Sequence, residues 1–152
     1  MYTVALLIHS WVRWIALVAG FGATLAAAND SNLKPNSRAE RWGLILMMAL
    51  DIQMLLGLLL YLVLSPFTAA ARQNFSAAMR NPDLRFWAVD HVSSMLIAVV
   101  LVHAARVLAR KATTPESRRT RLVVCFGIAT FFMLFGTPWP GLANGRPLFR
   151  FW

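Results

Sequence analysis

Six ionisable residues stand inside or at the edges of apolar stretches of this chain, and they are the ones that could do chemistry: His9, Arg13, Asp51, Asp90, His91 and His103. An ionisable side chain is costly in a hydrocarbon environment, so each of these residues needs a partner or a function. Their types and spacing are therefore the first guide to what the chain could bind.

His9 and His91 are expected to share one depth. His9 lies about seven residues, or about 10 Å, into the first apolar stretch, and His91 about six residues, or about 9 Å, into the third. If both stretches are helices of an up-down bundle, they run in the same direction and face each other diagonally across the core, where bundles build cofactor sites. Two imidazoles placed in this way are the minimum for bis-histidine ligation of a b-type haem. Such ligation needs an imidazole–iron–imidazole gap of about 4 Å, from two bonds near 2 Å.

Arg13 lies one helical turn from His9 on the same side of the helix. It could pair with a haem propionate, with a quinone oxygen or with Asp90. Other readings of the two histidines stay open. They could be interfacial residues bonded to water or backbone, ligands of a chlorophyll-type pigment, or part of a copper(I) site with Met95 and the methionines of the second stretch.

His103 belongs to a different site. It follows His91 by twelve residues, which is about 18 Å along a helix and about 120° around it, so one metal cannot bind both. The chain has three histidines, which excludes a second bis-histidine haem. Asp51 is expected at a similar depth in the second stretch. A buried Asp51–His103 pair would satisfy two costly groups, as a structural pair or as a proton relay.

The elements that must position these residues are four apolar stretches, at about 3–28, 42–64, 86–108 and 122–135. About 20 residues of helix span the 30 Å hydrocarbon layer, and backbone groups in lipid must be satisfied within a helix. The fourth stretch is short and is followed by Pro138 and Pro140. The chain is therefore expected to be all-α, a single domain over residues 1–152 that forms a four-helix transmembrane bundle.

The composition supports a lipid environment. The chain is 59% hydrophobic and 14% charged, with mean hydropathy +0.58, whereas soluble domains are about 45–50% apolar and about 25% charged. The net charge of +9 would suit nucleic acid, but the basic residues lie between the apolar stretches rather than along one face, so no nucleic-acid partner is expected. Motifs of hydrolases, P-loop proteins, zinc proteases and dinucleotide-binding folds are absent from the sequence, which leaves open whether the chain is an enzyme.

The distribution of Lys and Arg predicts the orientation. One side of the expected bundle carries Lys34, Arg38, Arg41, Arg106, Arg110, Lys111, Arg118, Arg119 and Arg121, and the other carries Arg72, Arg80, Arg85, Arg146 and Arg150. The richer side should be cytoplasmic. We therefore expect a multi-pass protein of the bacterial cytoplasmic (inner) membrane with N- and C-termini on the periplasmic side, its first apolar stretch retained rather than removed as a signal peptide.

Small residues indicate how the helices pack. Ala16, Gly20, Ala23 and Ala27 share one side of the first stretch, and small residues at this spacing allow close helix contact in lipid. In the third stretch Ala98, Ala105 and Ala109 do the same. Between the second and third stretches, Thr68–Met79 is expected to form one short interfacial helix. Cys125, the single cysteine, is expected to be a packing residue.

Four strings of the sequence carry a resemblance: HSWVRW at His9–Trp14, LDIQMLLGLLLY at Leu50–Tyr61, RFWAVDH at Arg85–His91, and TPWPGLANGRPLFR at Thr137–Arg150. Together they resemble a family of small bacterial four-helix integral membrane proteins that are loosely described as cytochrome-b-like. The resemblance runs along nearly the whole chain. It implies the four-helix fold and marks His9 and His91 as lying in the family's recognisable segments.

Two hypotheses of different classes follow. In the first, the chain is a membrane b-type haem protein that transfers electrons, with quinone as a candidate donor or acceptor, His9 and His91 as axial ligands and Arg13 beside a propionate. In the second, it is a non-catalytic accessory subunit, without a cofactor of its own, that packs against other membrane subunits of a respiratory or photosynthetic complex.

Overall fold

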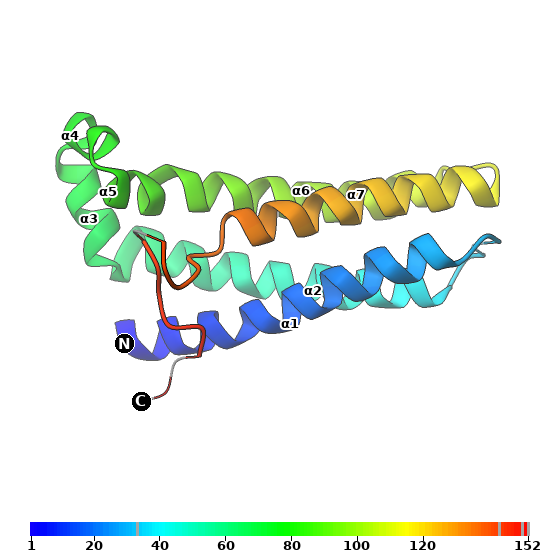
Figure 1. Ribbon diagram of the computed structural model, residues 1–152, viewed down its shortest axis with the longest axis horizontal. Coiled ribbons are helices and arrows are strands. Elements are labelled where there is room, and N and C mark those ends of the chain that lie inside the picture. Colours follow the sequence, from blue (N-terminus) through cyan, green and yellow to red (C-terminus); the bar gives the residue numbers. More distant parts are fainter. Residues whose placement is uncertain (33, 143, 150, 152) are drawn as a thin grey trace.

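The computed structural model describes all residues of the chain except 33, 143, 150 and 152, and in the described part all regular secondary structure is helical, without strands. Four long helical segments run side by side (Figure 1). They are α1 (Tyr2–Asn29), α2 (Arg38–Leu59) continued by the π-helical η1 (Leu60–Leu64), α5 (Pro82–Arg85) continued through the π-helical η2 (Phe86–Asp90) into α6 (His91–Arg110), and α7 (Pro115–Phe135).

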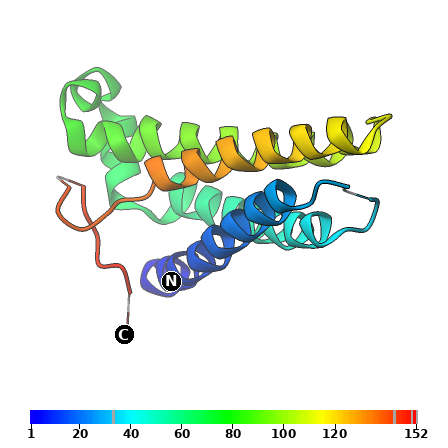
Figure 2. The ribbon, with the colours of Figure 1, turned by 45° about the vertical axis from the view of Figure 1, so that its right-hand side comes forward.

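The long helices form a bundle in which each one has two close neighbours. Helix α1 packs against α2 and α7, and α6 packs against α7 and α2. Therefore α1 and α6 form one diagonal of the bundle, and α2 and α7 form the other. The connections between α1 and α2 and between α6 and α7 lie at one end of the bundle. The N-terminus, the C-terminal segment and the short helices α3 (Pro66–Gln73), α4 (Phe75–Arg80) and α5 lie at the other end (Figure 1). Figure 2 shows that α1 crosses its neighbours at an angle.

Three helical segments of the described chain are long and apolar enough to cross a membrane: residues 2–29, 38–64 and 82–110. Helix α7 has 21 residues, but its first two turns carry Arg118, Arg119 and Arg121, which shortens its apolar part. The all-helical fold and its membrane-length helices are thus as the sequence predicted, and α7 as a fourth span remains a prediction.

Two helices begin earlier than their apolar stretches. Helix α7 starts at Pro115, not near residue 122, because Thr114 is a good N-cap whose hydroxyl accepts from Ser117 N at 3.1 Å, and proline is well suited to the first helical position. Helix α2 starts at Arg38, not near residue 42, because the Ser37 hydroxyl accepts from Glu40 N at 3.4 Å. Capping thus extends both helices past their apolar limits.

The expected single helix at Thr68–Met79 is two helices instead, α3 (Pro66–Gln73) and α4 (Phe75–Arg80). Asn74 separates them with a non-helical backbone, and its side-chain oxygen caps α4 by accepting from Ala77 N at 3.0 Å. Asparagine competes with helical hydrogen bonding in this way, which is why it interrupts an otherwise helical segment.

The core of the bundle is built on small residues, as the sequence predicted. The small residues predicted on α1 and α6 are buried: Ala16, Gly20, Ala23, Ala27, Ala98, Ala105 and Ala109. Cys125 is also buried in this core. The largest fully buried side chain is Phe126 of α7, which reaches across the bundle to Gly43 of α2.

Candidate functional site

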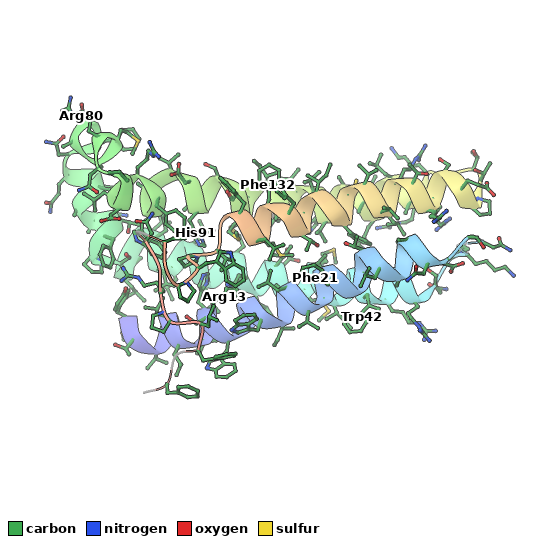
Figure 3. The ribbon with its side chains drawn as sticks, viewed as in Figure 1. Arg13, Phe21, Trp42, Arg80, His91 and Phe132 are labelled. Atoms are coloured by element: carbon green, nitrogen blue, oxygen red, sulfur yellow. The ribbon has the colours of Figure 1, made fainter. Side chains whose placement is uncertain are left out.

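His9 and His91 meet near the end of the bundle that holds the termini. His9 belongs to α1, and His91 is the first residue of α6. Their ring centroids are 6.2 Å apart, with an angle of 66° between the ring planes. Figure 3 shows His91 and Arg13 in the same region, beneath the C-terminal segment. The structure thus brings the two histidines together across the α1–α6 diagonal, with their rings inclined edge to face.

The ring of His91 is held in one orientation. Its Nδ1 lies 2.7 Å from the carbonyl oxygen of Gly136. Because a carbonyl oxygen only accepts, Nδ1 must carry the proton, and the lone pair of a neutral ring is then on Nε2. The rings of Phe86 and Trp87 lie 5.9 and 5.8 Å from it, centroid to centroid. The aromatic neighbours and the hydrogen bond together leave one nitrogen available to a ligand.

His9 is positioned by the facing side of α2. A Cβ added at Gly57 would lie 3.4 Å from Cε1 of His9, so the glycine leaves room for the ring. One turn earlier on α2, Gln53 Nε2 donates to the backbone carbonyl of His9 at 3.0 Å. The Nδ1 atom of His9 is buried without a hydrogen-bond partner among the described residues. This ring nitrogen is therefore one that a ligand could satisfy.

A cavity of about 130 Å³ contains both histidines. Along α1 it runs from Tyr2 to Leu17, which corresponds to about 22 Å of helix. Its walls are mainly apolar and include three methionines: Met54, Met95 and Met133. Methionine side chains are flexible and repack easily. A large flat ligand would need such walls to move apart, because the cavity as it stands holds only a few waters.

The charged groups of the cavity are all basic. Arg13 and Arg146 line it, and no Asp or Glu does so among the described residues. The Arg146 guanidinium lies over the rings of Phe67 and Trp87, at 4.9 and 5.3 Å from their centroids. A cavity whose charged side chains are basic suits a ligand that carries anionic groups.

Arg13 also holds the C-terminal segment against α1. Its Nη2 donates to the carbonyl oxygen of Leu148 at 2.7 Å, and the indole nitrogen of Trp14 donates to the same oxygen at 3.0 Å. The ring of Phe149 stacks on Trp14 at 5.3 Å. Asp90, the third partner considered for Arg13, pairs instead with Arg85 at 3.3 Å. The C-terminal segment is thus a wall of the cavity rather than a free tail.

Both π-helical segments lie beside this cavity. Tyr61 of η1 and Trp87 of η2 line it, and the Tyr61 hydroxyl donates to the carbonyl oxygen of Ala88 at 3.0 Å. The backbone carbonyl of Tyr61 accepts from Thr68 Oγ1 at 2.7 Å and from Arg72 Nη1 at 2.5 Å. Single π-turns within α-helices occur frequently at functional sites. Here both π-turns contribute a residue to the cavity that contains the two histidines.

Within the described residues, no group of three or more His, Cys, Asp or Glu side chains could hold a metal ion. Met95 lies in the cavity with His91, but Cys125 lines no part of it. A bare ion held by two imidazoles would lack most of its coordination sphere. Two histidines suffice where the remaining ligands arrive with the metal, as in a tetrapyrrole.

Asp51 and His103 come together elsewhere. His103 Nε2 lies 3.6 Å from Asp51 Oδ1, and the two side chains are 47% and 46% exposed. The expected pairing partners are thus neighbours, but the pair is not buried, because it bridges α2 and α6 on the outside of the bundle. Neither residue lines the cavity.

Sequence reasoning missed three contributors to the cavity: Gly136, Gly57 and Arg146. Gly136 acts through its backbone carbonyl, and Gly57 acts through the absence of a side chain, so neither carried a chemical signal. Arg146 was recognised only as a charge of the outer side.

Comparison of the chain with protein-family models, with curated proteins and with solved structures finds no match.

Proposed function

We propose that this chain is a membrane b-type haem protein that transfers electrons, with His9 and His91 as the axial ligands. The observation that carries the proposal is the 6.2 Å between their ring centroids across the α1–α6 diagonal. Two metal–imidazole bonds near 2 Å, with about 1 Å from each nitrogen to its ring centre, require about 6 Å between the rings. The haem would supply a one-electron carrier.

The residues around the histidines have the roles that such a site requires. Donation from His91 Nδ1 to Gly136 O, at 2.7 Å, fixes the tautomer and the ring orientation, as an outer-shell partner does for a metal-ligating histidine. His9 contributes a buried ring nitrogen that has no partner among the described residues. Arg13 and Arg146 would face the propionates, and the apolar walls would exclude water from the macrocycle.

The finer placement in the membrane is also part of the proposal. We place the chain in a bacterial cytoplasmic membrane, with α7 as the fourth span and both termini on the periplasmic side. The basic loops support this orientation, because nine Lys and Arg residues lie toward the end that joins α1 to α2 and α6 to α7, against four among the described residues of the segments at the other end, Arg72, Arg80, Arg85 and Arg146. A quinone suits such a chain as redox partner, since it diffuses in the same bilayer.

Absorption spectra of the purified protein test the proposal. The protein is expressed with added haem precursor, purified in mild detergent, and also titrated with haemin, and spectra are recorded oxidised and dithionite-reduced. We expect a sharp reduced α-band in the parent protein. His9→Ala and His91→Ala should each abolish the six-coordinate spectrum, because each removes one axial ligand.

His103→Ala is the matched control, since it removes an imidazole on the same helix as His91 but outside the cavity. Its spectrum should equal that of the parent protein. A colourless protein that keeps its helical circular dichroism and takes up no haemin would overturn the proposal. The chain would then be read as an accessory subunit, and purification with its neighbours would be the next step.

A further inference from the structure

The Asp51–His103 pair lies outside the cavity and has no role in the proposed haem site. It bridges α2 and α6 on the outside of the bundle, with His103 Nε2 and Asp51 Oδ1 3.6 Å apart. That separation is longer than a hydrogen bond. Among the described residues none donates to the Asp51 carboxylate, whereas His103 Nδ1 lies 3.0 Å from the carbonyl oxygen of Val99. The carboxylate thus lacks the hydrogen bonds that would compensate its burial in lipid.

The pair lies near the middle of the membrane-length segment of α2. Asp51 is thirteen residues from both Arg38 and Leu64, the ends of that segment, which is about 20 Å of helix on either side. About half of each side chain is exposed. Lipid tails offer no hydrogen bonds, and ionisable groups at this depth normally face protein or a water-filled cavity. Something other than lipid should therefore cover this surface.

We propose that the surface around Asp51 and His103 binds a second copy of this chain, related by a two-fold axis along the membrane normal. A rotation about that axis leaves every residue at its own depth. Because Asp51 and His103 lie at one depth, the rotation places Asp51 of one copy opposite His103 of the other. Each carboxylate then lies between two imidazoles, and the surface is complementary to itself, as a symmetric dimer requires.

The residues around the pair fit such an interface. Met48 and Leu55 lie one turn to either side of Asp51, and Val100 and Val107 lie one turn to either side of His103. They are exposed by 55%, 70%, 64% and 47%. A polar centre within an apolar border matches the use of polar residues to join helices in lipid. A second copy supplies both a carboxyl group and an imidazole at the right depth, without any further partner chemistry.

Cross-linking between two single-cysteine chains tests the inference. In a Cys125→Ala background, one chain carries Asp51→Cys and the other carries His103→Cys, each with its own affinity tag. Neither chain can form an internal disulfide. Within the mixed pair, His103 of the first chain still meets Asp51 of the second, so one of the two carboxyl–imidazole contacts survives. Co-expressed and oxidised in native membranes, the two chains should form a mixed disulfide dimer.

Val18→Cys on α1 is the control, because Val18 is also mid-helix and 59% exposed but belongs to another side of the bundle. Co-expression of Val18→Cys with His103→Cys should give at least ten-fold less mixed dimer. Equal cross-linking in the two mixtures, or no mixed dimer between the Asp51→Cys and His103→Cys chains, would overturn the inference.

The second measurement counts photobleaching steps of single, fluorescently labelled particles in nanodiscs. It is made first on the chain with unmutated Asp51 and His103. Two bleaching steps are expected for most particles, and Asp51→Leu should convert them to one step. The exchanged variant Asp51→His/His103→Asp should restore two steps, because it preserves the complementarity. One step for the unmutated chain at a high protein-to-lipid ratio would also overturn the inference, and neither result depends on haem.

Discussion

Gly43 offers the sharpest test of how the bundle is packed. A Cβ added there would lie 2.4 Å from Cζ of Phe126 and 3.0 Å from Cε2. Phe126 has 0% exposure, so its ring has little space in which to retreat. Gly43→Ala should therefore force α2 and α7 apart or displace the ring. Overpacking of this kind costs about 1–3 kcal/mol, against roughly 1 kcal/mol gained from replacing glycine by alanine in a helix.

Gly127→Ala is the matched control, because its added Cβ would meet only Thr24 Cγ2, at 3.7 Å. It should keep the gain of roughly 1 kcal/mol without the overpacking. The free energies of unfolding of the two variants should thus differ by about 1–3 kcal/mol. They can be measured by titrating mixed micelles with sodium dodecyl sulfate while following circular dichroism. If Gly43→Ala stabilises the protein as much as Gly127→Ala does, Phe126 is not packed on Gly43 and the arrangement of α2 and α7 is wrong.

Three further substitutions, measured by the same titration, test other contacts. Arg118→Ala should destabilise the protein by about 1–3 kcal/mol. The reason is that Arg118 Nη1 donates to Glu40 Oε1 at 2.7 Å and both side chains are largely buried. An unchanged free energy of unfolding would show that this contact does not hold α7 to α2. Gln53→Met should alter stability by less than about 1 kcal/mol, since it removes the buried, unpaired Oε1 together with one hydrogen bond. His9→Leu should stabilise the cofactor-free protein by about 1–3 kcal/mol, because it removes a buried nitrogen without a partner among the described residues. A loss of stability would instead assign His9 a structural role.

The sequence predicted the long helices well because their signal is simple. Length and apolar composition, set against the thickness of a bilayer, indicate where helices must lie. The same signal begins the fourth apolar stretch near residue 122, later than α7 itself, because Arg118, Arg119 and Arg121 interrupt the apolar composition. Tertiary contacts keep this basic turn helical: Arg118 binds Glu40, and Arg119 Nη2 donates to the carbonyl oxygen of Ala28 at 2.5 Å.

Only the side-chain part of the candidate site could be predicted from the sequence, whereas its backbone features could not. Helix geometry predicts that His9 and His91 lie at equal depth, and chain order predicts that their helices are diagonal neighbours. These two expectations are enough to predict that the histidines lie close together. The π-turns Leu60–Leu64 and Phe86–Asp90 left no such signal, because one extra residue in a helical turn alters neither composition nor period enough to be read. The carbonyl of Gly136 could not be anticipated either, since any residue carries one.

The two diagonals of the bundle differ in a way that bears on function. At the α2–α7 diagonal, Phe126 fills the centre and contacts Gly43, so protein alone closes the gap. At the α1–α6 diagonal, two imidazoles meet at a cavity that protein alone leaves open, and His9 leaves a ring nitrogen unpaired among the described residues. A bundle selected for stability alone would be expected to fill both gaps in the same way, since polar atoms without partners are costly. Natural proteins retain such costs mainly at functional sites. The asymmetry is therefore the strongest reason to look for a ligand between His9 and His91.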